Sequence, residues 1–592
     1  MRFIAAFVSF VIAFSMIAYG IAQRTILNGP DSVSVSAVVK SDAAVTVIDG
    51  KVLHAMSGRQ QVEISGADSI FAAYGRSRDV QAWIGDASYN KIGVNASKTK
   101  LTSRLMTGSD AEVPDPHGSD LWLGEYTHDN NLTFTVNVPT GISVIVVSNR
   151  VNQVPGRLSI SWPVDNRTPW SGPLIAGGVL LLVIGLGLYL WALASLRKAR
   201  GPRRKPPKSP KMPKLPKRRI YKPRQPEALV ADRGRRSVRR MVAVVPILLV
   251  GTLALSGCSR DLWPEALGGS PETTPTAISN PAKAAPPPPP AAPPPAVSVS
   301  QLKSIVARVS VIAAKADAAK DGTLAATRFA GPALKLREAN YAIRTADDTF
   351  PTPAPIPSQP IVLTLPQQSD SWPRTVFTVI GNPGDPKVVP TALMLIQQTP
   401  RDNYKVQYAV TLESKAVLPD VAPADVGAAR LPADIKLLTL RPDELTAAFG
   451  DILAKGPEST YTNRFDLKDD SLIKEIGLDA RNARKAKLQA SASMTFENAV
   501  GDGENVALAT NDSGAIVAVS LNEIVVVKPV AAGASVNAEG AVKSLSTVTS
   551  TTKGTSATYA DLLLFFVPAA NSNGKIVLLG WASGLIAAKE LP

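Results

Sequence analysis

The side chains best suited to chemistry are scarce in this chain, which has three histidines and one cysteine among its 592 residues. Histidines and carboxylates gather in one stretch, DPHGSDLWLGEYTHD at residues 115–129, where His117, Asp120 and His128 are the candidate metal ligands. A polar loop at one end of a β-sheet explains this stretch more simply, so we expect no metal and no cofactor. Because no histidine follows residue 128, a histidine-based triad is excluded from the second half of the chain.

Motifs that hold phosphates or sugar nucleotides are absent from the sequence. It contains neither GxxxxGK[ST] nor GxGxxG, and no two aspartates stand two residues apart as in an Asp-x-Asp metal motif. Gly185 and Gly187 lie inside an apolar run, where close helix packing explains them better than phosphate binding. These absences favour a non-enzymatic protein, and an enzyme or accessory of envelope glycan assembly is the alternative.

A second group of candidates follows a predicted helix start at Pro332. Arg328, Arg337, Tyr341 and Arg344 have spacings that a helix can bring to one side, where they could line the open end of a ligand pocket. The alternative is that they form ordinary salt bridges on a helix surface. The sequence does not decide between the two.

Basic residues concentrate in one segment. The formal net charge is +16, and residues 197–240 hold 19 Lys and Arg against two acids, so the rest of the chain is close to neutral. No folded domain is basic, and nucleic acid is not an expected partner. We expect this Pro-rich segment to be a cytoplasmic loop that contacts anionic lipids of the inner leaflet, or only a signal that fixes topology.

Two apolar runs are long enough to cross a bilayer as helices. Residues 3–22 and 173–196 carry no charge, and about 20 residues suffice for a span. Segment 1–22 is therefore a transmembrane helix or, because Gly20-Ile21-Ala22 resembles a processing site, a cleaved signal. Lys and Arg directly after residue 196 place that end inside the cell, so residues 23–172 are expected outside.

The third apolar run, residues 241–257, is short for a span and contains Pro246. It follows RGRRSVRR and ends in Leu255, Ser256, Gly257 and Cys258, which resembles a bacterial lipoprotein signal with its lipobox. The resemblance implies cleavage before Cys258 and lipidation of that residue. The alternative is a third plain anchor, so the chain has two or three transmembrane helices. Residues 258–297 are Pro-rich and are expected to form an extended stalk.

Period-two alternation dominates the part between the first two apolar runs. We expect residues 23–172 to form an all-β antiparallel sandwich. Its strands are expected at 32–38, 44–49, 60–65, 79–85, 132–138, 142–148 and 157–164, with His54 in a hairpin.

The last part of the chain reads as α+β, in two tandem halves at 298–420 and 421–592, each with helices followed by an antiparallel meander. Ser298 and Gln301 form a capping-box pattern ahead of the first helix, and Pro332 begins the second. Later helices are expected at 442–456 and 471–490. Strands are expected at 360–365, 374–380, 390–398, 404–412, 492–497, 515–521, 523–530, 558–567 and 575–581.

Three segments, residues 74–86, 120–127 and 161–174, together with the following span, basic loop, lipobox and RFAGPALKLREANYAIR (328–344), resemble an uncharacterised family of membrane proteins of high-GC Gram-positive bacteria. Some members carry an automatically assigned glycosyltransferase name, and this is what makes the enzyme alternative worth testing. The element order of the C-terminal half loosely resembles the cone-like NTF2 superfamily. We therefore expect a multi-pass cell-membrane protein with large extracytoplasmic domains that bind an envelope protein or glycan.

Overall fold

The computed structural model describes residues 2–39, 43–109, 113–148, 156–164, 168–199, 292–382, 384 and 388–592. The basic loop, the third apolar run and Cys258 lie outside these residues. Internal contacts divide the chain into two compact units, one of Met1–Ser34 with Ser161–Ala285 and one of Val35–Ile160 with Pro286–Pro592.

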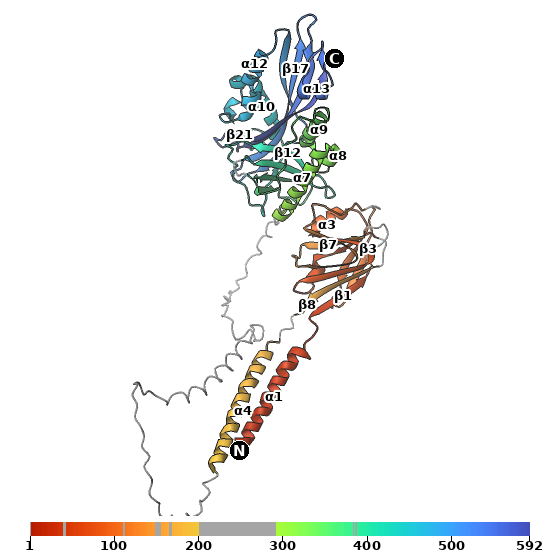
Figure 1. Ribbon diagram of the computed structural model, residues 1–592, viewed down its shortest axis with the longest axis vertical. Helices are drawn as coiled ribbons and strands as arrows, with labels where there is room; N and C mark the ends of the chain where they lie inside the picture. Colours follow the sequence, from red (N-terminus) through yellow and green to blue (C-terminus); the bar gives the residue numbers. More distant parts are fainter. Residues whose placement is uncertain are drawn as a thin grey trace, which may run out of the picture. The chain divides into compact units, whose positions relative to one another are not determined.

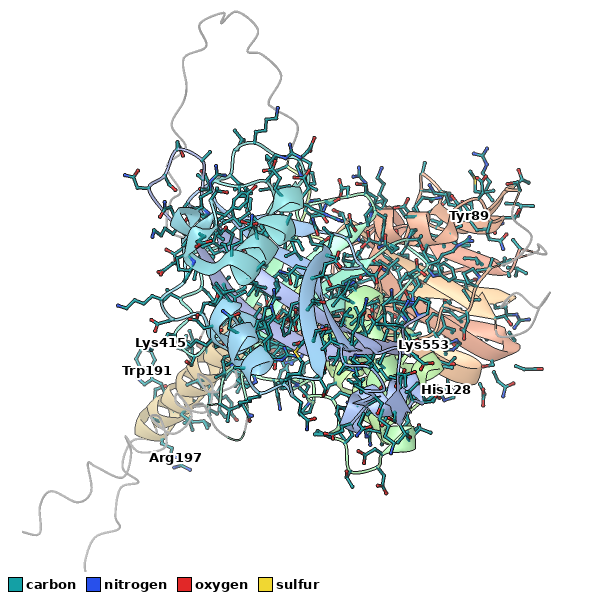
Figure 2. All side chains as sticks on the ribbon, turned by 90° about the horizontal axis from the view of Figure 1, so that it is seen from above. Tyr89, His128, Trp191, Arg197, Lys415 and Lys553 are labelled. Carbon is teal, nitrogen blue, oxygen red and sulfur yellow. The ribbon has the colours of Figure 1, made fainter. Side chains whose placement is uncertain are left out.

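Two long helices, α1 (Arg2–Thr25) and α4 (Ser171–Ala199), make up the described core of the first unit (Figure 1). Both are long and apolar enough to cross a membrane. Trp191 and Arg197, labelled in Figure 2, lie near the end of α4. The helices run antiparallel, because a Cβ built on Gly20 would lie 2.8 Å from Ile175 Cγ1 and one built on Gly185 would lie 3.3 Å from Ser9 Cβ.

Small residues line the contact between these helices at every seventh position. The buried small residues, which we call the small-residue seam, are Ala6, Ala13 and Gly20 on α1 and Ser171, Gly178, Gly185 and Ala192 on α4. A seven-residue repeat keeps one side of each helix facing its partner along its length. The predicted close packing is confirmed for Gly185, whereas Gly187 has nothing within 4 Å and faces away.

Residues 35–160, the N-terminal module, are built on one eight-stranded sheet. Its strand order is β1-β8-β3-β7-β2-β4-β5, with β6 also paired to β3. The elements are β1 (Ser32–Val38), β2 (Val45–Ile48), α2 (Gly50–Leu53), β3 (Gln60–Arg76), α3 (Ser77–Ile84), β4 (Tyr89–Val94), β5 (Leu101–Met106), β6 (Gly124–Val136), β7 (Ile142–Ser148) and β8 (Arg157–Pro163).

The expected richness in strands is confirmed, whereas the all-β antiparallel sandwich is not: the strands belong to one sheet, and the helices α2 and α3 lie between them in the sequence. Strands β2 and β4 pair in parallel. The segment expected to form a strand at 79–85 lies in the helix α3. Its buried residues, Asp79, Val80, Trp83 and Ile84, follow a helical period. The apolar residues Val80, Ala82 and Ile84 also alternate, and for this reason the sequence pattern indicated a strand. His54 ends the short helix α2 and is not in a hairpin.

The C-terminal domain, residues 292–592, begins with α7 (Val299–Ala319), α8 (Gly322–Ala326) and α9 (Gly331–Ala346). The predicted capping box is present, since Ser298 accepts from Gln301 N and the Gln301 side chain accepts from Ser298 N. Strands β9 (Ile361–Pro366), β10 (Arg374–Ile380), β11 (Thr391–Gln397) and β12 (Lys405–Leu412) follow. The remaining elements are β13 (Arg430–Leu431), α10 (Pro442–Lys455), β14 (Phe465–Asp466), α11 (Ser471–Ile476), α12 (Leu478–Ala486), β15 (Ala492–Val500), β16 (Val506–Ala509), β17 (Ala515–Pro529), β18 (Val536–Asn537), α13 (Gly540–Ser546), β19 (Ser550–Thr551), β20 (Thr555–Val567) and β21 (Ile576–Glu590).

Two boundaries in this domain differ from expectation. The helix expected at 471–490 is divided into α11 and α12 at Gly477, where a Cβ would lie 2.3 Å from Ile473 O. The strands expected at 515–521 and 523–530 are one long strand, β17, because residues 515–529 pair without interruption along β20 and β15.

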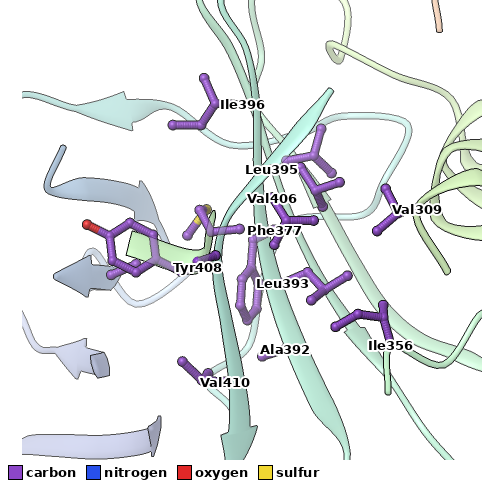
Figure 3. Packing of buried hydrophobic residues seen from close by; sticks show 14 of the residues in the cluster. Val309, Ile356, Phe377, Ala392, Leu393, Leu395, Ile396, Val406, Tyr408 and Val410 are labelled. Atoms are coloured by element: carbon purple, nitrogen blue, oxygen red, sulfur yellow. The ribbon is translucent and has the colours of Figure 1, made fainter. Parts of the chain in front are cut away.

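One eleven-stranded sheet runs through both expected halves of this domain. Strand β12 pairs with β21, with Thr411 opposite Trp581, so the boundary at residue 420 falls within a continuous sheet. Alternate residues of β20 enter two cores, Leu562 and Leu564 beside α7 and Leu563 and Phe565 beside α10. Figure 3 shows the first core, with Val309 and Ile356 on one side of its strands and Tyr408 on the other.

Candidate functional site

The candidate metal ligands do not come together. His117 contacts Asp115 at 2.5 Å, and His128 is exposed on β6 (Figure 2), with Nδ1 2.9 Å from Asp129 O. Hydrogen bonds from His117 lower the pKa of Asp115. Among the described residues, no three His, Cys, Asp or Glu side chains are grouped as around a metal ion.

Asp120, the third of these candidates, is fully buried and bound to cations of the chain itself. Its carboxylate accepts from Arg328 Nη1 at 2.5 Å, from Arg308 Nη1 at 3.1 Å and from Tyr404 N at 2.8 Å. The side chain is 0% exposed. Two arginines and a backbone N–H use the acceptor sites that a metal would need, so Asp120 is part of an ionic contact, and Arg328 with it.

Tyr341 and Arg344 both bind Asp317 of α7. The Tyr341 hydroxyl donates to Asp317 Oδ1 at 2.6 Å, and Arg344 Nη1 donates to Asp317 O at 2.7 Å. Burial raises the pKa of Tyr341, and the hydrogen bond to Asp317 raises it further. These two residues hold α9 against α7.

Arg337 differs from Arg328, Tyr341 and Arg344 because two nitrogens of its guanidinium group have no hydrogen-bond partner among the described residues. The side chain is 7% exposed, and its guanidinium lies 3.9 Å from the ring centre of Phe329. Nε is 3.4 Å from Asp317 Oδ1 without hydrogen-bond geometry, and the buried Nη2 has no partner among the described residues. Burial lowers the pKa of Arg337, and the nearby Asp317 opposes this. A buried guanidinium group with a free donor favours an anion beside it.

A cavity of about 300 Å³ lies beside Arg337. Its walls come from α9, the segment 350–356 and strands β11, β12 and β21. Asn340 also lines it, donating to Pro351 O at 2.9 Å, while its Oδ1 is buried without a partner in the described structure. The apolar lining residues are Leu336, Ile343, Phe350, Pro351, Pro353, Ala354, Pro355, Ile356, Ala409, Val410, Ala582, Gly584 and Leu585. The polar ones are Arg337, Asn340, Thr352, Thr391, Thr411 and Ser583. This cavity, the Arg337 pocket, has the size and mixed lining of a small-molecule site.

Comparison with known protein families matches residues 293–590 to the domain of unknown function (DUF8094). The match covers half of the chain. The chain belongs to this family. The C-terminal domain is called the DUF8094 domain from here on, and it contains the whole Arg337 pocket. No similar curated protein and no similar solved structure was found.

Sequence reasoning brought out Arg337 but not the rest of the pocket. Helical spacing grouped four residues, of which the structure places only Arg337 in the cavity wall. The segment 350–356 went unnoticed, although PTPAPIP, with proline at alternate positions from Pro351 to Pro357, is a signal for an extended strap that cannot join a sheet. Asn340 carried no signal of its own.

Proposed function

We propose that the protein is a non-enzymatic, membrane-anchored component of the cell envelope whose DUF8094 domain binds an apolar ligand with an anionic group. The Arg337 pocket carries this proposal. Among the described residues that line it, Arg337 is the only charged side chain, so the lining offers a charge partner and no pair of groups for acid–base catalysis.

The chemistry of the ligand follows from the contacts of Arg337. Its guanidinium group is desolvated by Phe329 and the pocket wall, and its nearest carboxylate, Asp317, already accepts a hydrogen bond from the Tyr341 hydroxyl. A carboxylate or phosphate oxygen of a ligand would supply a charge partner for the guanidinium group. The apolar walls would receive a hydrocarbon portion of the ligand.

Membrane anchoring rests on α1 and α4. In this proposal both helices cross the membrane as an antiparallel pair, with the N-terminus and the basic loop inside and the folded domains outside. The small-residue seam supports retention of α1, because membrane helices associate through close backbone contacts of this kind. Lipidation of Cys258 belongs to the same proposal, and cleavage there would release a C-terminal fragment of roughly 35 kDa that stays with membranes.

The ligand proposal is tested with short amphiphiles on the full chain in lipid nanodiscs. We expect octanoate to raise the melting temperature of the DUF8094 domain, and 1-octanol and octylammonium to have a much smaller effect. Arg337→Gln removes the response to octanoate and Ala409→Leu, which fills the pocket, weakens it. The matched control Arg344→Gln keeps the response, because Arg344 does not line the pocket. Equal responses to octanoate and octanol, or no response in the wild type, would refute the proposal.

Topology is tested separately, by labelling single cysteines in a Cys258→Ser background. Cysteines at residues 100 and 450 should react from outside the cell, and one at residue 215 only after permeabilisation. Labelling of residue 215 from outside contradicts the proposed orientation.

A further inference from the structure

The second compact unit is made of two stretches separated in the sequence by residues 161–285. The N-terminal module and the DUF8094 domain contact each other through buried ionic groups. In the buried pairs the acidic partners come from the module, and the basic partners come from the DUF8094 domain. Asp120 with Arg328 and Arg308 is the first of these contacts.

Asp79 and Arg374 form a second buried pair. Asp79 lies in the first turn of α3 and Arg374 begins β10, and Arg374 Nη2 donates to Asp79 Oδ1 at 2.7 Å. Their side chains are 2% and 1% exposed. The Arg374 guanidinium also stacks 3.7 Å from the ring centre of Trp372, and Trp372 packs against the module's cluster of buried residues around Trp83.

Backbone groups of the module are bound as well. Arg401 donates from Nε to Trp83 O at 3.0 Å and from Nη2 to Ile84 O at 2.8 Å. These carbonyls lie at the C-terminal end of α3, where a cation is favoured. Gln301 donates to Leu121 O at 3.2 Å.

Between the two ionic contacts lies Tyr404, which is 1% exposed. Its backbone N–H binds Asp120, and burial raises the pKa of its hydroxyl, with Arg374, Asp120 and Asp79 near enough to act on it. The two ionic contacts thus belong to one buried interface. If the module and the DUF8094 domain were separated, each would be left with charged side chains whose oppositely charged partners are on the other.

We infer that the face of the DUF8094 domain bearing Arg328, Arg374 and Arg401 is a docking site for the N-terminal module of this chain, and that the two stay bound when the polypeptide between them is cut. The protein then acts as two noncovalently joined parts. Processing ahead of Cys258 would leave one part on each product without separating them. The inference does not depend on the ligand of the Arg337 pocket.

The test uses the full chain with Cys258→Ser, in membranes, with a site for a specific protease inserted between residues 285 and 286. After complete cutting, judged on a denaturing gel, the fragment from residue 286 should sediment with the membranes. Asp79→Arg, which puts two positive charges together at a buried site, should raise the released fraction about tenfold or more. The exposed Asp129→Arg on the same module should release no more than the wild type.

A variant with the charges of Asp79 and Arg374 exchanged distinguishes loss of the ion pair from misfolding of Asp79→Arg. Asp79→Arg combined with Arg374→Asp restores an oppositely charged pair and should return the fragment to the membranes. Release of the wild-type fragment after cutting would overturn the inference. So would retention of Asp79→Arg at the wild-type level, or equal release of the single and the double variant.

Discussion

Helices α1 and α4 contact each other through small residues. The N-terminal module and the DUF8094 domain contact each other through large, charged side chains that are buried. At Gly178 a Cβ would come within 2.9 Å of Ala13 O. At Asp120 two guanidinium groups surround one carboxylate. Both contacts join segments far apart in the sequence, by opposite chemistry.

The difference fits the membrane that we propose around α1 and α4 and the water around the second unit. In hydrocarbon, burial of apolar surface gives helices no reason to associate, so backbones that can approach closely gain dispersion energy instead. In water, apolar burial supplies association, and buried charge pairs decide which surfaces fit, because a wrong partner leaves a charge without its counterion. The small-residue seam is thus sensitive to added volume, and the ionic interface to lost charge.

Loss of the Asp120 carboxylate should have the largest effect. Asp120→Ala leaves the buried Arg328 without its carboxylate partner. We therefore expect the second unit to lose about 3–5 kcal/mol of unfolding free energy. Urea unfolding followed by tryptophan fluorescence measures the loss. Asp129→Ala, an exposed carboxylate on the same module, should change stability by less than about 0.5 kcal/mol. A loss below about 1 kcal/mol for Asp120→Ala would show that the buried charges are solvated after all.

Asp561 sharpens the comparison because it is a buried carboxylate that forms no salt bridge with any described residue. Burial raises its pKa to about 7, the nearby Glu523 adds to the rise, and Ser583 opposes it. The folded state therefore holds this proton more tightly than the unfolded state, and stability falls as pH rises from about 4 to about 7. The total loss is on the order of a few kcal/mol.

Unfolding measured between pH 4 and pH 8 should show this slope, and Asp561→Asn should flatten most of it. Asp470, whose pKa burial raises to about 6, contributes a slope of the same sign that remains in the variant. Unchanged pH dependence in Asp561→Asn would mean that Asp561 titrates normally.

Added volume should break the contact between α1 and α4. In a Cys258→Ser background, Ser9→Cys with Gly185→Cys should form a disulfide readily, since the Cβ atoms would be 3.3 Å apart. Gly178→Leu should suppress this crosslink and cost about 1–3 kcal/mol of helix association. Gly187→Leu, with nothing within 4 Å, should leave it intact. Equal crosslinking of the two leucine variants would place the contact on another face.

The smallest effect is expected at the exposed edge of the ionic interface. Arg78 pairs with Asp370, but its side chain is 67% exposed. Arg78→Ala should cost less than about 1 kcal/mol, since water competes with such a pair. If Arg78→Ala lost as much unfolding free energy as Asp120→Ala, burial would not explain why the Asp120 ion pairs are stronger than the exposed Arg78–Asp370 pair.

Local patterns in the sequence predicted local structure well. Ser298 and Gln301 located the start of α7, and alternation located strands such as β10. Helix α3 was missed because Val80, Ala82 and Ile84 satisfy period two while Asp79 and Trp83 complete a helical face. Strands β4 and β5 were missed because most of their residues are polar or exposed.

The ionic interface could not be predicted because its partners are single residues far apart. Asp79 and Arg374 show no local pattern, and Asp120 stood out only as a possible metal ligand. The small-residue seam was readable, since Gly178, Gly185 and Ala192 repeat at seven residues, yet only Gly185 and Gly187 were singled out. Lipidation at Cys258 stays a prediction, because that residue lies outside the described structure.

The pairing of β12 with β21 has a consequence for how the protein is made. Strand β12 ends at Leu412, and its partner β21 begins at Ile576, close to the end of the chain. At about 5–20 residues per second, the roughly 160 residues between them take on the order of 10 to 30 s to synthesise. During that time strands β9 to β12 present an unpaired edge of the kind that attracts other chains. Newborn DUF8094 domains should therefore need a chaperone until the ribosome has finished the last strand.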